Sequence, residues 1–117
     1  MTSGATMILM AGAKLVIIYP RPLDEDTFEK AYRNEHMPMV ESKFRGVTRF
    51  VATRVLHSPQ GKVTAYRQAE FHFTSMAELN KCLESEPGKQ VVEHATKLST
   101  GGQPILLVCE EESFVYW

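Results

Sequence analysis

The sequence predicts an α+β fold, and three observations lead to this prediction. Two short runs, residues 14–19 (KLVIIY) and 104–109 (PILLVC), are apolar on both faces, as expected for strands that are covered on both sides. Residues 47–57 and 63–73 are rich in valine, threonine and phenylalanine and flank a turn sequence, which is typical of an antiparallel hairpin. Helical periodicity follows the first strand and the third strand. The resulting order, βαββαβ, is the ferredoxin-like arrangement, in which an antiparallel four-stranded sheet carries its helices on one face.

A single domain accounts for the length and composition of the chain. Its 117 residues are 44% hydrophobic and 23% charged, which provides enough apolar material for one core and argues against disorder. Residues 1–13 are predicted to be a flexible N-terminal tail, and residues 14–114 are predicted to be the folded domain.

Charge and targeting signals exclude several classes of partner. The formal net charge is -1 and no basic run occurs, so neither nucleic acid nor an anionic membrane is expected to bind. The apolar stretch at residues 7–13 is far shorter than the ~20 residues that cross a bilayer, and no basic segment precedes it. Cys82 and Cys109 form no metal knuckle or disulfide framework, which favours a cytoplasmic protein.

The first helix is predicted to begin after Asp24, a favourable N-cap that is followed by acidic residues in the first turn. Tyr32 and His36 continue an apolar stripe at helical spacing, so His36 should turn inward with that stripe. Pro38 lacks a backbone N–H and disfavours helical conformation at the residue before it. The helix should therefore break or restart at Pro38, with one further turn at residues 39–44.

The second helical segment opens with a capping box, in which Ser75 is followed three residues later by Glu78. The Pro87–Gly88 pair interrupts this segment. A helical face then resumes with His94 at its margin.

The third strand alternates between two chemically different faces. One face carries Ala69, Phe71 and Phe73, and the other carries Tyr66, Gln68, Glu70 and His72. The face of the sheet without helices has no cover within the chain, and an apolar surface of this kind usually marks an interface. A homodimer is therefore expected, with Glu70 and His72 making polar contacts between its subunits.

His36 is the candidate catalytic residue, because an imidazole with an unperturbed pKa of ~6.5 is largely neutral at neutral pH and accepts a proton. Five side chains are candidate substrate contacts, namely Tyr19, Tyr32, Met39, Phe71 and His94. Tyrosine hydroxyls can orient a phenolic or carbonyl oxygen, although many buried tyrosines only satisfy a backbone group. A purely structural histidine is the alternative interpretation of His36.

No metal and no cofactor are expected. The dipeptide Glu-His occurs twice, at residues 35–36 and 93–94, but these ligands lack a recognised metal-binding spacing. The glycines form no dinucleotide-binding or P-loop pattern, so neither flavin, NAD nor ATP has a predicted cradle. Any chemistry should therefore be cofactor-free or supplied by the substrate.

Five short motifs together resemble the EthD family of small dimeric α/β-barrel proteins. They are YPRP at a strand end, EHMPMV at the helix break, HSPQG in the hairpin, YRQAEFHF before TS, and SEPGK in the second helical segment. The similarity extends from about Lys14 to about Phe114. It implies a homodimer with paired sheets, and a pocket between each sheet and its helices in which His36 matches the histidine of the family. One position departs from the pattern, because His94 stands where the family tends to carry an aspartate.

The resemblance implies an activity as well as a fold. Related dimeric barrels include cofactor-free monooxygenases, cyclases and isomerases that act on aromatic or polyketide-like molecules. We therefore expect an oxidoreductase-like, cofactor-independent enzyme that acts on a hydrophobic oxygenated or aromatic small molecule, with His36 as its general base. The alternative is a non-catalytic carrier or an accessory protein of a separate oxygenase system.

Overall fold

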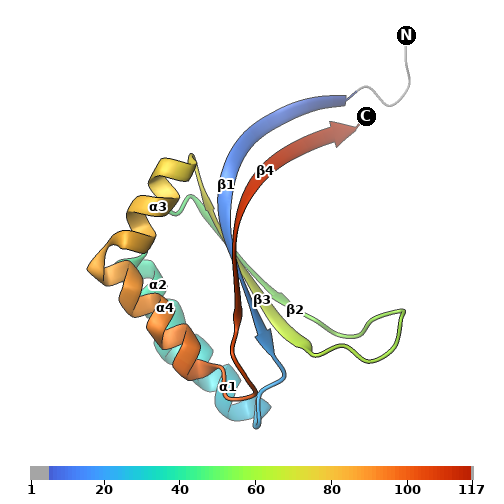
Figure 1. Cartoon of the computed structure of the whole chain (residues 1–117). Coiled ribbons are helices and arrows are strands. Elements are labelled where there is room, and N and C mark those ends of the chain that lie inside the picture. The colour runs from blue at the N-terminus through green and yellow to red at the C-terminus, as the bar shows by residue number, and fades with distance from the viewer. Residues whose placement is uncertain (1–5, 117) are drawn as a thin grey trace.

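The computed structural model describes residues 6–116, with side chains from residue 12 onward, and it contains one four-stranded antiparallel sheet. The strands are β1 (Thr6–Pro20), β2 (Arg49–Arg54), β3 (Ala65–Phe73) and β4 (Ile105–Tyr116). Their order across the sheet is β2-β3-β1-β4, so that β1 pairs with both β3 and β4. All helices lie on one side of this sheet (Figure 1). The predicted ferredoxin-like α+β fold is therefore confirmed.

The helical layer consists of α1 (Glu25–Ala31), the π-helical turn η1 (Tyr32–His36), α2 (Met37–Lys43), α3 (Met76–Glu84) and α4 (Glu86–Leu98). The predicted caps are present at α1 and α3. Asp24 accepts a hydrogen bond from the backbone N–H of Thr27 at 2.9 Å, and Ser75 accepts one from the N–H of Glu78 at 3.1 Å. The first four N–H groups of a helix have no partner within the helix, and each cap satisfies one of them, which favours a helix start at these positions.

The first helical segment does not break at Pro38. The N–H of Met37 instead donates to the carbonyl of Tyr32, five residues earlier, which is the hydrogen bond of a π-helix. Pro38 then occupies the first turn of α2, directly after this wider turn. The chain accommodates the proline by widening one turn, and it remains helical from residue 25 to residue 43.

Strands β1 and β4 are longer than the strands predicted at residues 14–19 and 104–109. Their antiparallel register continues from Ala13 paired with Glu110 to Thr6 paired with Tyr116, and this part of the pair extends away from the helices (Figure 1). Residues 6–13 therefore lie in β1, although the sequence predicted a flexible tail there, and residues 1–5 of that tail lie outside the described residues. The apolar stretch at residues 7–13 is thus the continuation of β1, and its backbone pairs with the end of β4.

The core lies between the sheet and the helices. Leu15, Ile17 and Tyr19 of β1 point into it and are 1%, 0% and 0% exposed. Phe71 and Phe73 of β3 do the same. The opposite side of the sheet, which we call the open face, carries alternate residues of each strand: Lys14, Val16 and Ile18 of β1, Arg49 and Val51 of β2, Gln68, Glu70 and His72 of β3, and Ile105, Leu107, Cys109 and Glu111 of β4. The predicted separation of Phe71 from Glu70 and His72 is thus confirmed. Tyr66, which the sequence placed with Glu70 and His72, instead lies on the helical side, where its ring contacts Phe28 of α1.

Candidate functional site

His36 is the last residue of the π-helical turn and is wholly buried, with 0% of its surface exposed. The wider turn places its ring against Tyr32, in a stacked pair with ring centroids 5.6 Å apart. The Nε2 atom of His36 lies 3.5 Å from the hydroxyl of Tyr19, which is long for a hydrogen bond. A second irregularity occurs nearby, because the β1–β3 register shifts between Tyr19 and Pro20. Both π-turns and β-bulges are frequent next to functional sites.

His94 of α4 contacts His36 directly. The two Nδ1 atoms are 2.9 Å apart, and the rings are stacked with centroids separated by 5.2 Å. At this distance one Nδ1 must donate a proton to the other, so the two imidazoles are complementary tautomers when both are neutral. The free Nε2 of His94 lies 3.6 Å from Oε1 of Glu35, and 20% of the His94 side chain is exposed. The helices therefore join two histidines that are 58 positions apart in the sequence.

Tyr19 and Tyr32 are buried donors beside this pair. Burial raises the pKa of Tyr19 far above its ordinary value, and burial raises the pKa of Tyr32 to about 12. Both hydroxyls therefore keep their protons at neutral pH. Among the buried side-chain nitrogen and oxygen atoms of the described residues, only the Tyr32 hydroxyl has no hydrogen-bond partner. A buried hydroxyl without a partner is rare in folded proteins, and this one can donate to a bound molecule.

An ion pair beneath the tyrosines was not predicted from the sequence. Arg67 is 6% exposed, its guanidinium lies 4.7 Å from the centre of the Tyr32 ring, and it donates two hydrogen bonds to Glu29. Tyr66 donates a further hydrogen bond to Glu29 at 2.9 Å. Burial opposes ionisation of Glu29, but the hydrogen bonds from Arg67 and Tyr66 outweigh it and hold the pKa of Glu29 below its ordinary value. These hydrogen bonds hold the Arg67 guanidinium against the Tyr32 ring.

Met39 and Phe71 have different surroundings. Met39 lines a cavity of about 220 Å³ together with His94, Gln90, Glu93 and Lys97, so it lies beside the histidine pair. Phe71 is 0% exposed and packs against Phe44 and Phe50, with ring centroids 4.9 Å and 4.7 Å away. The structure therefore brings Tyr19, Tyr32 and His94 to His36, places Met39 beside His94, and places Phe71 in a separate aromatic group.

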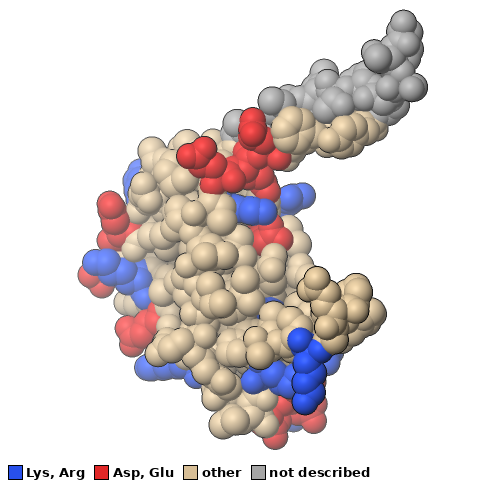
Figure 2. Space-filling view, turned by 45° about the vertical axis from the view of Figure 1, so that its right-hand side comes forward, with Lys and Arg blue, Asp and Glu red and all other residues tan. Residues whose placement is uncertain are grey.

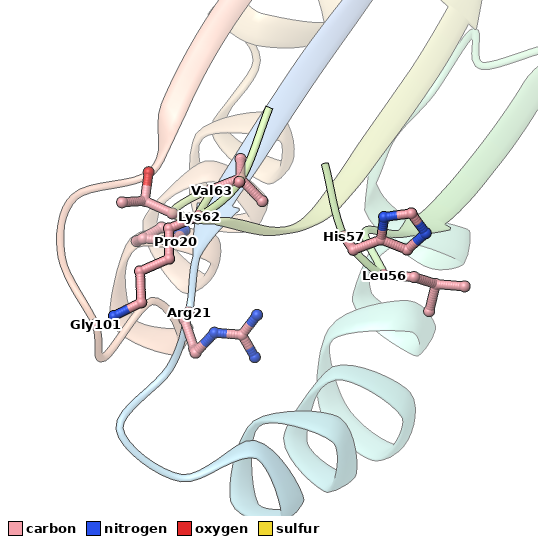
Figure 3. Close-up of a pocket in the computed structure, with 9 residues that line it drawn as sticks. Pro20, Arg21, Leu56, His57, Lys62, Val63 and Gly101 are labelled. Carbon is pink, nitrogen blue, oxygen red and sulfur yellow. The ribbon is translucent and has the colours of Figure 1, made fainter. Parts of the chain in front are cut away.

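A larger cavity, of about 570 Å³, lies at the hairpin between β2 and β3. Its lining includes Arg21, Leu56, His57, Lys62 and Val63, and the side chain of Leu56 points away from it (Figure 3). Neither His36 nor His94 lines this cavity. Tyr19, Tyr32 and Met39 are absent from its lining as well, so it is not the site that the sequence predicted.

The open face carries a group of possible metal ligands, Glu70, His72 and Glu111, whose ligand atoms lie within 4.8 Å of one another. The ammonium of Lys14 lies between the two carboxylates, 2.8 Å from Glu70 and 3.1 Å from Glu111. Hydrogen bonding to Lys14 lowers the pKa of Glu70, and hydrogen bonding to Glu70 raises the pKa of Lys14. A bound dication would have to compete with this lysine, so the donor set fits an internal ion-pair network better than a metal centre.

The buried state of His36 predicts a pH-dependent stability. Burial, and then the neighbouring His94, lowers the pKa of His36 from 6.5 to about 4. The unfolded chain binds this proton more readily than the folded protein, so the free energy of unfolding should fall as the pH drops from 6.5 towards 4. At about 1.4 kcal/mol per pKa unit, the loss is roughly 3 kcal/mol.

Urea titrations near neutral pH and near the lower pKa should measure this loss. The His36→Asn variant cannot bind the proton and should lose less stability than the wild type over the same range. His57→Asn removes an exposed histidine and is the matched control, which should behave like the wild type. Equal losses in all three proteins would contradict the assignment.

Comparison with known proteins supports the fold and the family resemblance. No protein-family model matches the chain. A protein of Rhodococcus erythropolis, described as an uncharacterized 11.0 kDa protein in the thcB-thcC intergenic region, is 28% identical over 98 residues, which cover 84% of this chain and 94% of that protein. The crystal structure of an EthD family protein from Bacillus halodurans is similar with a TM-score of 0.77 and 28% identity, over 86% of this chain and 98% of the other. The resemblance to the EthD family is therefore confirmed.

Two more distant structures share the fold. A dimeric ferredoxin-like protein of unknown function from Jannaschia is 14% identical, with a TM-score of 0.61 over 86% of this chain and 99% of the other. A protein described as a putative antibiotic biosynthesis monooxygenase from Caulobacter crescentus is 15% identical, with a TM-score of 0.58 over 87% and 90%. Within residues 6–116, none of the helices has the length and apolar character needed to cross a membrane.

Proposed function

We propose that this protein is a cofactor-independent, oxidoreductase-like enzyme that removes a proton from a hydrophobic oxygenated or aromatic small molecule. The observation that carries the proposal is the 2.9 Å contact between Nδ1 of His36 and Nδ1 of His94, which links a buried tyrosine cluster to a surface cavity. The likeness to an EthD family protein supports an oxygenase-associated role. So does the shared fold with a protein described as an antibiotic biosynthesis monooxygenase, at the level of the fold alone.

The histidine pair suits general base catalysis. Two coupled imidazoles provide one lone pair that accepts a proton and one N–H that holds the partner ring in place, as a second group does for other catalytic histidines. His36 is the member that the family resemblance identifies as catalytic, and its low pKa keeps it neutral at neutral pH. The hydroxyls of Tyr19 and Tyr32 remain protonated and can donate to the oxygen of a bound anion.

A non-catalytic carrier or accessory protein is the second candidate, and one observation favours it. The imidazole of His36 has no exposed surface, and a substrate cannot touch it without movement of the helices. A pKa of about 4 also makes His36 a weak base. In a carrier the cluster of tyrosines and histidines would only position a ligand.

We also propose that two copies of the chain assemble through the open face. Ile105 and Leu107 are 53% and 43% exposed, and they lie on this face beside Val16. The middle of the side turned forward in Figure 2 carries few charges, as an interface core requires. The polar network of Lys14, Glu70, His72 and Glu111 would then lie between the sheets. A cytoplasmic location agrees with the unpaired Cys82 and Cys109.

A substrate screen separates the enzyme from the carrier. Phenols and anthrone-like compounds are incubated aerobically with the protein, product formation is followed by mass spectrometry, and binding is followed by thermal shift. An enzyme should convert at least one compound that also raises the melting temperature. Strong stabilisation by several compounds with no product at any pH would favour the carrier and overturn the enzymatic proposal.

A further inference from the structure

The member of the histidine pair that reaches a cavity is His94. His36 is 0% exposed, whereas 20% of the His94 side chain is exposed and His94 lines the 220 Å³ cavity with Met39, Gln90 and Lys97. The lining residues come from α2 and α4, so the cavity opens on the helical layer rather than between the helices and the sheet. A substrate in this cavity would meet His94 first.

The atoms of His94 define its possible role. Its Nδ1 is engaged with Nδ1 of His36 at 2.9 Å, so Nε2 is the nitrogen left for a ligand. If Nδ1 of His94 carries the hydrogen and donates it to His36, Nε2 presents a lone pair and can accept a proton. The carboxylate of Glu35, 3.6 Å from Nε2, would stabilise the imidazolium that results. His36 keeps its lone pair for His94, because its own protonation is suppressed by burial.

The charges around the cavity suggest what kind of substrate it takes. Lys97 lines the cavity and makes only an exposed ion pair with Glu93, at 3.7 Å, so its ammonium is free to approach a bound anion. Gln90, which also lines the cavity, is held by a hydrogen bond from Lys43 of α2. The remaining charged or titratable groups that face His94 are Glu35 and His36 of η1. The cavity is therefore lined by a base, a cation, an amide and the carboxylate of Glu93, and a cation close to the base fits a molecule that becomes an enolate or a phenolate.

We propose that Nε2 of His94 accepts the proton of an enolisable ketone or a phenol bound in the α2–α4 cavity, and that His36 is a positioning residue. The substrate C–H or O–H bond breaks and leaves its electron pair on the substrate, a bond forms between that proton and Nε2, and Lys97 offsets the charge of the anion. No oxidant takes part in this step. The inference rests on the proposed function, but it assigns the contact with the substrate to His94 instead of His36.

Proton abstraction is tested by hydrogen exchange, which needs no oxidant. The probe is α-tetralone in D₂O, and ¹H NMR follows the loss of the signal from the protons next to its carbonyl. Wild-type protein should accelerate this exchange. His94→Asn should reduce the acceleration by ~10²-fold or more, as expected for a lost general base. Lys97→Met should lower kcat more than it raises KM, because the probe binds as a neutral ketone and gains the charge that the ammonium offsets only as the proton leaves.

The role of His36 is read from the pH profile. His36→Asn should slow the exchange and shift the pH at which the rate rises, because the group bonded to Nδ1 sets the proton affinity of Nε2. His94→Asn should remove that pH-dependent rise. A structural role for His36 would lower the rate through unfolding alone and leave the pH of the rise unchanged. His57→Asn, in the hairpin cavity, is the matched control and should exchange the probe as the wild type does.

The outcomes separate the two proposals. If His36→Asn abolishes exchange and His94→Asn keeps at least half of it, His36 contacts the substrate and the inference is wrong while the proposed function stands. If neither variant changes the rate of exchange or the turnover of a screened substrate, the proposed function fails as well. If His57→Asn is the variant that loses exchange, the reaction takes place in the hairpin cavity and both assignments are wrong.

Discussion

Replacing His36 with asparagine should lower the turnover of a substrate identified by the screen by ~10²- to 10⁴-fold, the range typical of a lost acid–base group. The reason is the same whether His36 accepts the proton or holds the ring of His94. Asparagine cannot serve as a base, and its amide cannot reproduce both the Nδ1 contact at 2.9 Å and the stacking on Tyr32. Steady-state kinetics with the purified variant measures the effect.

Folding must be checked in the same preparation, because His36 is buried. Asparagine is smaller than histidine and keeps one hydrogen-bonding group, so the variant should still unfold in a single cooperative transition near neutral pH. His57→Asn is again the matched control, since its side chain is exposed. A folded His36→Asn protein with wild-type turnover would show that the buried histidine is only structural.

Replacing Leu107 with lysine should convert a dimer into a 13.2 kDa monomer. Leu107 is 43% exposed in the single chain, so a lysine there can extend into water and the monomer should remain folded. In a dimer packed through the open face, the same ammonium would be buried opposite an apolar sheet. Burying an unpaired ammonium costs several kcal/mol, and a complex with a micromolar Kd has a binding free energy of only about 8 kcal/mol. The substitution should therefore remove most of the dimer.

Light scattering coupled to size exclusion at micromolar concentration measures the mass of each variant. Leu23→Lys is the matched control, because Leu23 is 85% exposed and lies in the loop before α1, away from the open face. It should have the mass of the wild type. A wild-type protein that is already monomeric would refute the dimer, and a Leu107→Lys protein that stays dimeric would place the interface elsewhere.

Local sequence signals predicted the parts of the fold that have local causes. The caps at Asp24 and Ser75 depend on side chains within three residues of the N–H groups that they bind. The hairpin turn depends on Gly61, whose φ of 106° is unfavourable for other residues. The helix around Pro38 was predicted less well, because the energy of a π-turn depends on how Tyr32 and His36 pack against the rest of the protein.

The candidate site needed the tertiary structure. Sequence spacing indicated an inward His36, but nothing in the sequence places Nδ1 of His94 at 2.9 Å from it. The pairing of Glu29 with Arg67 was also missed, since both residues resemble ordinary surface charges in the sequence. The sequence did carry a signal for both members of this ion pair. Glu29 directly follows the apolar Phe28 of the helical stripe, and Arg67 alternates along its strand with Ala69 and Phe71, so its side chain points to the same face.

The central position of β1 also constrains when the protein can fold during synthesis. Strand β1 begins at Thr6, yet its neighbour β4 ends at Tyr116, almost at the other end of the chain. During synthesis the hairpin of β2 and β3 and the described helices are therefore complete before β4 exists to pair with the second edge of β1. Until then the backbone N–H and C=O groups on that edge of β1 are unpaired and can pair with other chains, and contacts between distant segments form slowly. Chaperone dependence in the cell should accordingly be greatest for chains that are truncated before Ile105.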